Sequence, residues 1–85
     1  MKGDTRYYYV RYHHPIGYPY AYCSLVETLN NEMKECKVVG ICREESPFED
    51  LICWRFLVKV NDNDEFLREI FRHRPTEDFM TILPA

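Results

Sequence analysis

Residues 6–13, RYYYVRYH, are rich in apolar and aromatic side chains and contain no signal that starts or ends a helix, which predicts a β-strand. A repeat of two residues is the period of a β-strand, because successive side chains of a strand point to opposite faces of the sheet. Tyr8, Val10 and Tyr12 then form one face, and the other face, which carries Arg11 and His13, also has Tyr7 and Tyr9. We therefore predict a strand over residues 6–13 whose core side is formed by Tyr8, Val10 and Tyr12.

The next segment, residues 14–23, contains prolines and a glycine, which predict an irregular connection. The pattern then becomes helical, with apolar residues at Leu25, Val26, Leu29 and Met33. Ser24 and Glu27 have the spacing of a capping box, in which each side chain accepts a hydrogen bond from the other residue's backbone N–H. These signals predict a helix over residues 25–34. The alternative is a strand that continues from the aromatic residues 18–23 through Glu27.

Two further strands are predicted over residues 36–44 and 51–60, with a turn at residues 46–50 between them. The second of these strands alternates regularly, and one of its sides consists of Ile52, Trp54, Phe56, Val58 and Val60. The short turn predicts that the two strands pair as an antiparallel hairpin.

The register of this hairpin decides which side chains are neighbours. Pairing Glu44 with Leu51 also pairs Cys42 with Cys53. The same register sets β-branched residues opposite aromatic ones, a favourable cross-strand combination, in the pairs Ile41–Trp54 and Val39–Phe56. We therefore predict that Cys42 and Cys53 are direct cross-strand neighbours.

A second helix is predicted over residues 63–73. Asp62 and Glu65 have the spacing of another capping box, and Pro75 ends the helix near Arg74. Its apolar stripe consists of Phe66, Leu67, Ile70 and Phe71. A final strand follows at about residues 78–83.

These elements follow one another in the order β-α-β-β-α-β, and 85 residues suit a single domain over residues 1–85. This order predicts the α+β class and a ferredoxin-like fold, a four-stranded antiparallel sheet with both helices on one face. The right-handed preference of crossover connections favours the strand order 4-1-3-2. We expect the core to include Ile41, Trp54, Phe56, Val58, Phe66, Ile70 and Phe71.

Helices that cover one face of such a sheet leave the other face open. We predict a binding site on that face, formed by Tyr7, Tyr9, Arg11, Arg55 and Leu57. The strand over residues 36–44 is expected to add Val38, Gly40 and Cys42. The face is then less polar than a solvent face usually is, which indicates a binding surface. The alternative is that residues 14–23 fold back and cover it.

Charge and cysteine content narrow the function classes. The net charge of −3 and the pI near 5.5 give no whole-molecule attraction to nucleic acid. No stretch approaches the roughly 20 apolar residues that span a membrane, so no membrane association is expected. The four cysteines lack a C-x-x-C pair, which predicts free thiols rather than zinc ligands. We expect a cytoplasmic protein without metal or cofactor, because thiols stay reduced in the cytosol.

The expected function is that of a small non-enzymatic interaction module. Tyrosine and arginine are enriched at protein interfaces, and both occur on the predicted open face. We expect a regulator or inhibitor that binds a larger protein or assembly through this face and that forms a homodimer. The step from a small acidic domain to a regulator is made by analogy.

Two other function classes compete with this expectation. One is a domain like the RNA-recognition motif, in which aromatic side chains on the sheet stack on single-stranded bases. The strand LICWRFLVKV lacks the aromatic pattern of those motifs. The other is an enzyme that uses His13, His14 and Cys23, but no third orienting group, metal spacing or phosphate-binding glycine loop accompanies them. We therefore expect no catalytic residues.

Overall fold

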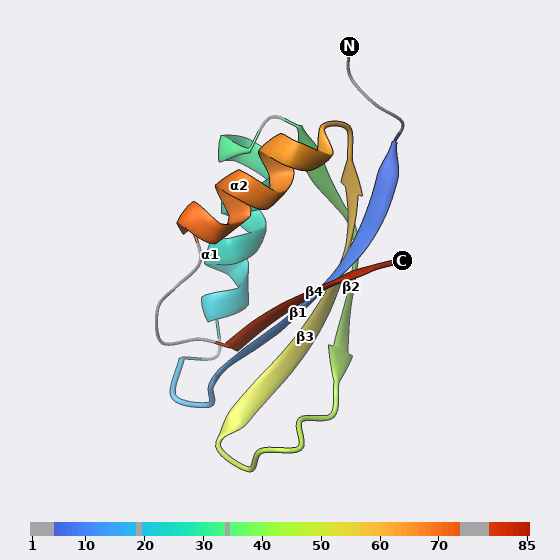
Figure 1. Cartoon of the computed structure of the whole chain (residues 1–85). Coiled ribbons are helices and arrows are strands. Elements are labelled where there is room, and N and C mark those ends of the chain that lie inside the picture. Colours follow the sequence, from blue (N-terminus) through green and yellow to red (C-terminus); the bar gives the residue numbers. More distant parts are fainter. Residues whose placement is uncertain (1–4, 19, 34, 74–78) are drawn as a thin grey trace.

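The computed structural model describes residues 5–18, 20–33, 35–73 and 79–85 (Figure 1). Its elements are β1 (Arg6–Pro15), α1 (Ala21–Glu27), η1 (Thr28–Glu32), β2 (Cys36–Glu44), β3 (Leu51–Val60), α2 (Asn63–His73) and β4 (Phe79–Pro84). The segment η1 continues α1 as π-helix. The predicted order β-α-β-β-α-β is confirmed, and the chain has an α+β ferredoxin-like fold. The predicted boundaries at residues 34, 74, 75 and 78 lie outside the described residues.

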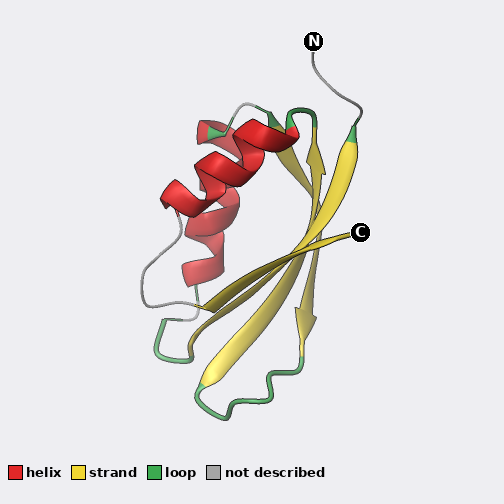
Figure 2. Ribbon diagram, viewed as in Figure 1, coloured by secondary structure: helices red, strands yellow, loops and turns green. Residues whose placement is uncertain are grey.

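All four strands form one antiparallel sheet in the order β2-β3-β1-β4. This is the predicted order 4-1-3-2, read from the other edge. Figure 2 shows the helices on one face of the sheet, while the opposite face has no helix over it in the described part of the chain. No helix among the described residues is long and apolar enough to cross a membrane.

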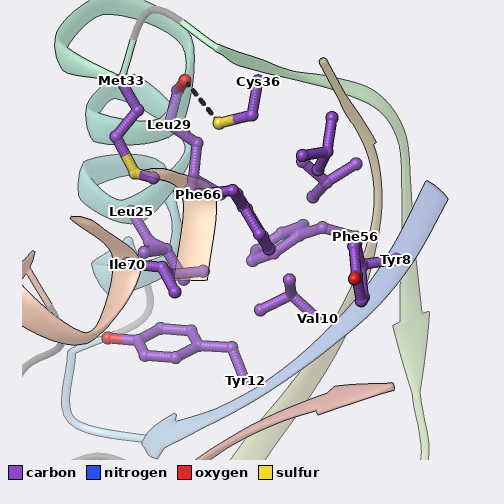
Figure 3. Packing of buried hydrophobic residues seen from close by; sticks show 12 residues of the cluster. Tyr8, Val10, Tyr12, Leu25, Leu29, Met33, Cys36, Phe56, Phe66 and Ile70 are labelled. Carbon is purple, nitrogen blue, oxygen red and sulfur yellow. Dashed lines mark hydrogen bonds between the residues drawn. The ribbon is translucent and has the colours of Figure 1, made fainter. Parts of the chain in front are cut away.

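The core lies between the sheet and the helices (Figure 3). Tyr8, Val10 and Tyr12 of β1 are buried in it, as predicted. The predicted core residues that are also buried are Phe56, Val58, Phe66 and Ile70. The ring of Tyr8 stacks on that of Phe66 at 5.4 Å between centroids, and its hydroxyl donates a hydrogen bond to Asn63 Oδ1. These contacts join β1 to the first turns of α2.

Two predicted core residues are less buried than expected. Ile41 is 47% exposed, because β2 is an edge strand with a neighbouring strand on only one side. Trp54 is half-buried and packs against the margin of the core. The side chain of Phe71 lies outside the described residues.

The strand β1 is two residues longer than predicted. His14 pairs with Ile52 and is fully buried on the helix side, where its ring lies near those of Tyr12 and Tyr22. Pro15 is the last residue of the strand, where the missing N–H of proline is tolerated. The predicted irregular connection over residues 14–23 is therefore shorter at its start.

The first helix begins earlier than predicted. It starts at Ala21, so Ser24 lies within the helix, and the predicted capping box with Glu27 does not form. The ring of Tyr22 stacks on Trp54 with 4.0 Å between centroids, and this packing favours helix formation before Ser24. The alternative of a strand through Glu27 is also wrong. The predicted apolar stripe is confirmed by buried Leu25, Leu29 and Met33, with half-buried Val26 packed against them.

The second helix begins where the sequence predicts it. The Oδ1 atom of Asp62 accepts a hydrogen bond of 3.1 Å from the backbone N–H of Glu65, and α2 starts at Asn63. This bond satisfies one of the N–H groups that have no partner within the helix. Asp64 and Glu65 also place negative charge in the first turn, which suits the helix dipole.

The strands β2 and β3 have the predicted bounds, but from Gly40 to Glu44 their register differs from the predicted one by two residues. Glu44 lies opposite Cys53, and Cys42 lies opposite Arg55. The prediction that Cys42 and Cys53 are cross-strand partners is therefore wrong. The observed register brings the Glu44 carboxylate to the guanidinium groups of Arg11 and Arg55, an ion-pair arrangement that favours it over the predicted register.

A β-bulge at Val39 interrupts the pairing of β2 with β3. Gly40 lies opposite Leu57 and Val38 lies opposite Val58, so one residue is inserted between them. Because strand side chains alternate between faces, the insertion reverses the predicted faces of all β2 residues before it. Val38 turns toward the core, contrary to prediction, and Lys37 turns to the face without helices.

The π-helical segment η1 ends with a backbone hydrogen bond of its own, and one of its side chains forms a hydrogen bond with β2 beside this bulge. The Met33 N–H donates a hydrogen bond of 3.1 Å to the carbonyl oxygen of Thr28, five residues earlier. The side chain of Asn30, which lies in this segment, accepts a hydrogen bond of 2.9 Å from the Val38 N–H. A backbone group on the edge of the sheet thus has a partner outside the sheet.

Candidate interaction surface

We call the sheet face opposite the helices the open face. The five residues predicted to form a binding site all lie on it and are neighbours: Tyr9 pairs with Leu57, Arg11 pairs with Arg55, and Tyr7 lies one pair further along. The alternation of β1 and β3 was sufficient to place them, because neither strand contains a bulge where they pair.

An apolar row crosses the open face through all four strands. Leu83 of β4 pairs with Tyr9 of β1, Tyr9 pairs with Leu57 of β3, and Leu57 pairs with Gly40 of β2. Leu83 is 46% exposed, whereas Tyr9 and Leu57 are half-buried. The row is continuous, since each member is the direct cross-strand neighbour of the next.

A hollow of about 230 Å³ lies over the β2 end of this row. It is lined by Tyr9, Gly40, Ile41, Cys42, Arg55 and Leu57. Gly40 has no side chain to fill it, and a Cβ atom at this position would lie 3.5 Å from the Cβ of Leu57, an ordinary contact. Close packing therefore does not require a glycine at this position. Because glycine has no side chain, the hollow has space for a side chain of a partner.

A small ionic network lies beside the hollow. One carboxylate oxygen of Glu44 lies 3.1 Å from Arg11 Nε, and the other lies 3.6 Å from Arg55 Nη1. The guanidinium of Arg55 also lies over the ring of Tyr9, 5.0 Å from its centroid. Glu44 therefore neutralises part of the repulsion between two arginines that lie directly opposite each other.

Lys37 and Lys59 form a second pair of like charges on the open face. They lie directly opposite each other on β2 and β3, and both side chains are exposed. The sequence prediction missed Lys37, because the bulge at Val39 changes the face to which it points. Gly40 inside the strand was the available signal, since a glycine within a strand often marks a bulge.

A buried cysteine–histidine pair lies on the same side of the sheet, beyond the arginines. The Sγ atom of Cys53 lies 3.7 Å from His13 Nε2, and the ring of Phe48 meets the His13 ring edge-on at 6.0 Å. Among the described residues no hydrogen-bond partner is present for His13 Nδ1. Sequence reasoning did not pair these residues, because they are far apart in the chain.

The electrostatics of this pair do not favour a cysteine nucleophile. Burial lowers the pKa of the His13 imidazole, and the nearby Arg11 guanidinium lowers it further. Burial raises the pKa of the Cys53 thiol. Both groups are then neutral near pH 7, whereas an activated cysteine is a thiolate paired with a cationic group.

The three residues considered as a possible enzyme site, His13, His14 and Cys23, do not form a cluster. His13 lies on the open-face side of β1, His14 lies on its helix side, and Cys23 belongs to α1. In the described part of the chain no three His, Cys, Asp or Glu side chains are grouped so that they could hold a metal ion.

Residues 14–23 do not cover the open face with their described side chains. Ile16, Tyr18 and Tyr20 are exposed, and Tyr22 packs on the helix side against Trp54. The alternative of a face covered from within the chain by this segment is therefore wrong.

Comparison with protein-family models, with curated proteins and with solved structures finds no match to this chain.

Proposed function

We propose that the protein is a small non-enzymatic interaction module, a regulator or inhibitor that binds a larger protein or assembly through its open face. The observation that carries this proposal is the apolar row from Leu83 through Tyr9 and Leu57 to Gly40. The exposed face of an antiparallel sheet is usually polar, and a contiguous apolar strip on it favours a partner.

The hollow at the end of the row supports binding by an inserted side chain. Interface energy is concentrated in a few buried anchors that fill pockets, and tyrosine and arginine are frequent among them. Tyr9, Arg55 and Leu57 line this hollow from the central strands, and Gly40 and Cys42 line it from β2. A partner's apolar side chain would be surrounded on several sides while its backbone follows the sheet.

A homodimer through the open face stays a prediction. In a two-fold dimer the same surface meets itself, so the lysine and arginine pairs of one copy would approach those of the other. This repulsion works against self-association and favours a partner of different composition. The location stays a prediction too: all four cysteines are free, which supports the cytoplasm, where thiols are kept reduced.

Single-stranded nucleic acid is the second candidate ligand. The observation in its favour is the set of cations beside Tyr7 and Tyr9 on the open face. Against it, the Arg55 guanidinium already lies over the ring of Tyr9, and β3 presents no aromatic side chain on this face. The platform for stacking bases is therefore small.

The test of the proposal is affinity capture from a lysate of cells that express the protein. We expect Tyr9→Glu combined with Leu57→Glu to abolish capture of partners that the wild type retains in about 0.5 M salt, because apolar burial is not screened. The matched control is Ile16→Glu with Tyr18→Glu, which changes an exposed aliphatic residue and a tyrosine off the open face.

Two outcomes separate the candidates, and one further measurement tests the homodimer. Equal loss of capture in both double variants contradicts the proposal. Capture of RNA that weakens steeply with salt supports the nucleic-acid candidate instead, since counterion release governs such binding. The solution mass of the wild type, measured over a range of concentration, tests the homodimer.

A further inference from the structure

The open face carries a charge opposite to that of the whole chain. Among the described residues, its charged side chains are four cations, Arg11, Lys37, Arg55 and Lys59, and the carboxylate of Glu44. The chain has a net charge of −3. The field close to this face therefore favours an anionic group, although the molecule as a whole is acidic.

The two cross-strand pairs of like charge differ in how they are neutralised. The pair Arg11–Arg55 shares the Glu44 carboxylate, at 3.1 and 3.6 Å. No carboxylate among the described residues forms an ion pair with Lys37 or Lys59. Like charges directly opposite each other destabilise a sheet, so a bound carboxylate between the lysines would remove an unfavourable interaction.

The lysine pair and the hollow lie over the same two strands. The hollow lies where Gly40 faces Leu57, and the lysine pair includes Lys59, two residues further along β3. Two residues of a strand span about 7 Å. Side chains at alternate positions of an extended peptide are separated by the same distance and point the same way.

Resting on the proposed function, we infer that the partner presents an extended acidic segment that lies along β2 and β3. An apolar side chain of this segment fills the hollow, and a glutamate or aspartate two residues away lies between Lys37 and Lys59. Glu44 neutralises part of the charge of the arginines, whereas no carboxylate of the described residues neutralises the lysines, so the lysines determine where the partner's carboxylate binds.

A protein segment fits these features better than a nucleic acid does. Leu57 and Cys42 contribute an aliphatic and a sulfur-containing side chain to the hollow, and the one aromatic ring in it, that of Tyr9, lies under the Arg55 guanidinium. An apolar side chain needs only such a cavity, whereas a base gains most from an accessible aromatic plane.

Peptide binding measured by fluorescence anisotropy at low salt tests this inference. The probe is a fluorescein-labelled glycine–serine peptide with one central phenylalanine and a glutamate two residues to either side. A second peptide of the same composition has both glutamates directly beside the phenylalanine. Because neighbouring side chains of an extended chain point to opposite sides, we expect the second peptide to bind about tenfold more weakly.

The charge contacts are tested with paired variants of the protein. Lys37→Glu with Lys59→Glu is expected to weaken binding of the first peptide by tenfold or more, because repulsion replaces attraction. Arg6→Glu with Arg68→Glu makes the same change in net charge at exposed positions off the open face, and its affinity should change less than threefold. Thermal melting of both variants checks that the fold is intact.

Three results would overturn the inference: equal binding of the two peptides, equal effects of the two double variants, or tighter binding of a fluorescein-labelled oligouridylate than of either peptide. The capture experiment with the Tyr9 and Leu57 variant is independent of these. Capture that depends on Tyr9 and Leu57 while no peptide binds would leave the proposed function standing and exclude the acidic segment. If capture does not depend on Tyr9 and Leu57 and no peptide binds, the proposed function is excluded as well.

Discussion

The indole ring of Trp54 lies against the phenol ring of Tyr22, with 4.0 Å between the ring centroids and 24° between the ring planes. The contact joins the middle of β3 to the first turn of α1. The guanidinium of Arg43 also lies over the Trp54 ring, 5.6 Å from its centroid. A residue predicted to be a simple core side chain thus fixes where the first helix begins.

Replacing Trp54 by alanine should lower the free energy of unfolding by about 3 kcal/mol, the low end for a large aromatic residue, because Trp54 is only half-buried. Tyr22→Ala should cost less. A double-mutant cycle should give a coupling of about 0.5–1.5 kcal/mol for the stacked pair. Urea denaturation measures these values. Tyr20→Ala is the control, because Tyr20 is 75% exposed, and an equal loss there would contradict the assignment.

Gly40 offers a test of the hollow that leaves the rest of the open face unchanged. Gly40→Ala should be neutral or stabilise the protein by up to about 1 kcal/mol, because the new Cβ makes an ordinary contact and the unfolded chain loses freedom. Gly40→Val should keep the fold and fill the hollow, so partner capture should fall. Thermal melting and the capture assay give the two readouts. Full capture by a stable Gly40→Val protein would show that the hollow is not used.

His13 should make stability depend on pH. Its pKa is lowered in the folded state, by burial and by Arg11, so below its ordinary value near 6.5 the unfolded chain binds more protons than the folded one. Stability should therefore rise with pH through this range and fall on acidification from pH 7.5 toward 5.5. Urea unfolding of the wild type and of His13→Gln measures it, and the variant should show a shallower dependence. Parallel curves would contradict this assignment.

The cysteines should differ strongly in their reactivity. Cys36 is buried, its thiol donates a hydrogen bond of 3.4 Å to the Leu29 carbonyl oxygen, and burial raises its pKa to about 11. Iodoacetamide near pH 8 should alkylate exposed Cys42 well before buried Cys36, because only the thiolate reacts. Mass spectrometry of the digested protein follows each site. All four should react at similar rates in denaturant, and equal rates for Cys36 and Cys42 in the folded protein would contradict the prediction.

The elements whose ends are specified locally were predictable from the sequence. The bounds of β2 and β3 follow from their alternation and the turn between them, and the start of α2 follows from Asp62. The start of α1 was not predictable in this way. It depends on the packing of Tyr22 against Trp54, residues more than thirty positions apart, which overrides the capping signal of Ser24.

The candidate site was predictable on the central strands and not on the edge strand. Tyr9, Arg11, Arg55 and Leu57 occupy a regular antiparallel pair, so alternation alone gives their face. Placing Lys37 requires the bulge at Val39, which depends on how β2 pairs with β3 and on the hydrogen bond of Val38 to Asn30. The sequence of β2 alone does not show where its pairing with β3 gains an extra residue.

The outer edge of β2 also bears on aggregation. Fibrils grow when each molecule extends a neighbour's sheet at both of its edges, through unbroken rows of backbone N–H and C=O groups. On β2 the Val38 N–H is already bonded to Asn30, and the bulge at Val39 breaks the row beside it. These two features disfavour the addition of a neighbouring strand at this part of the β2 edge.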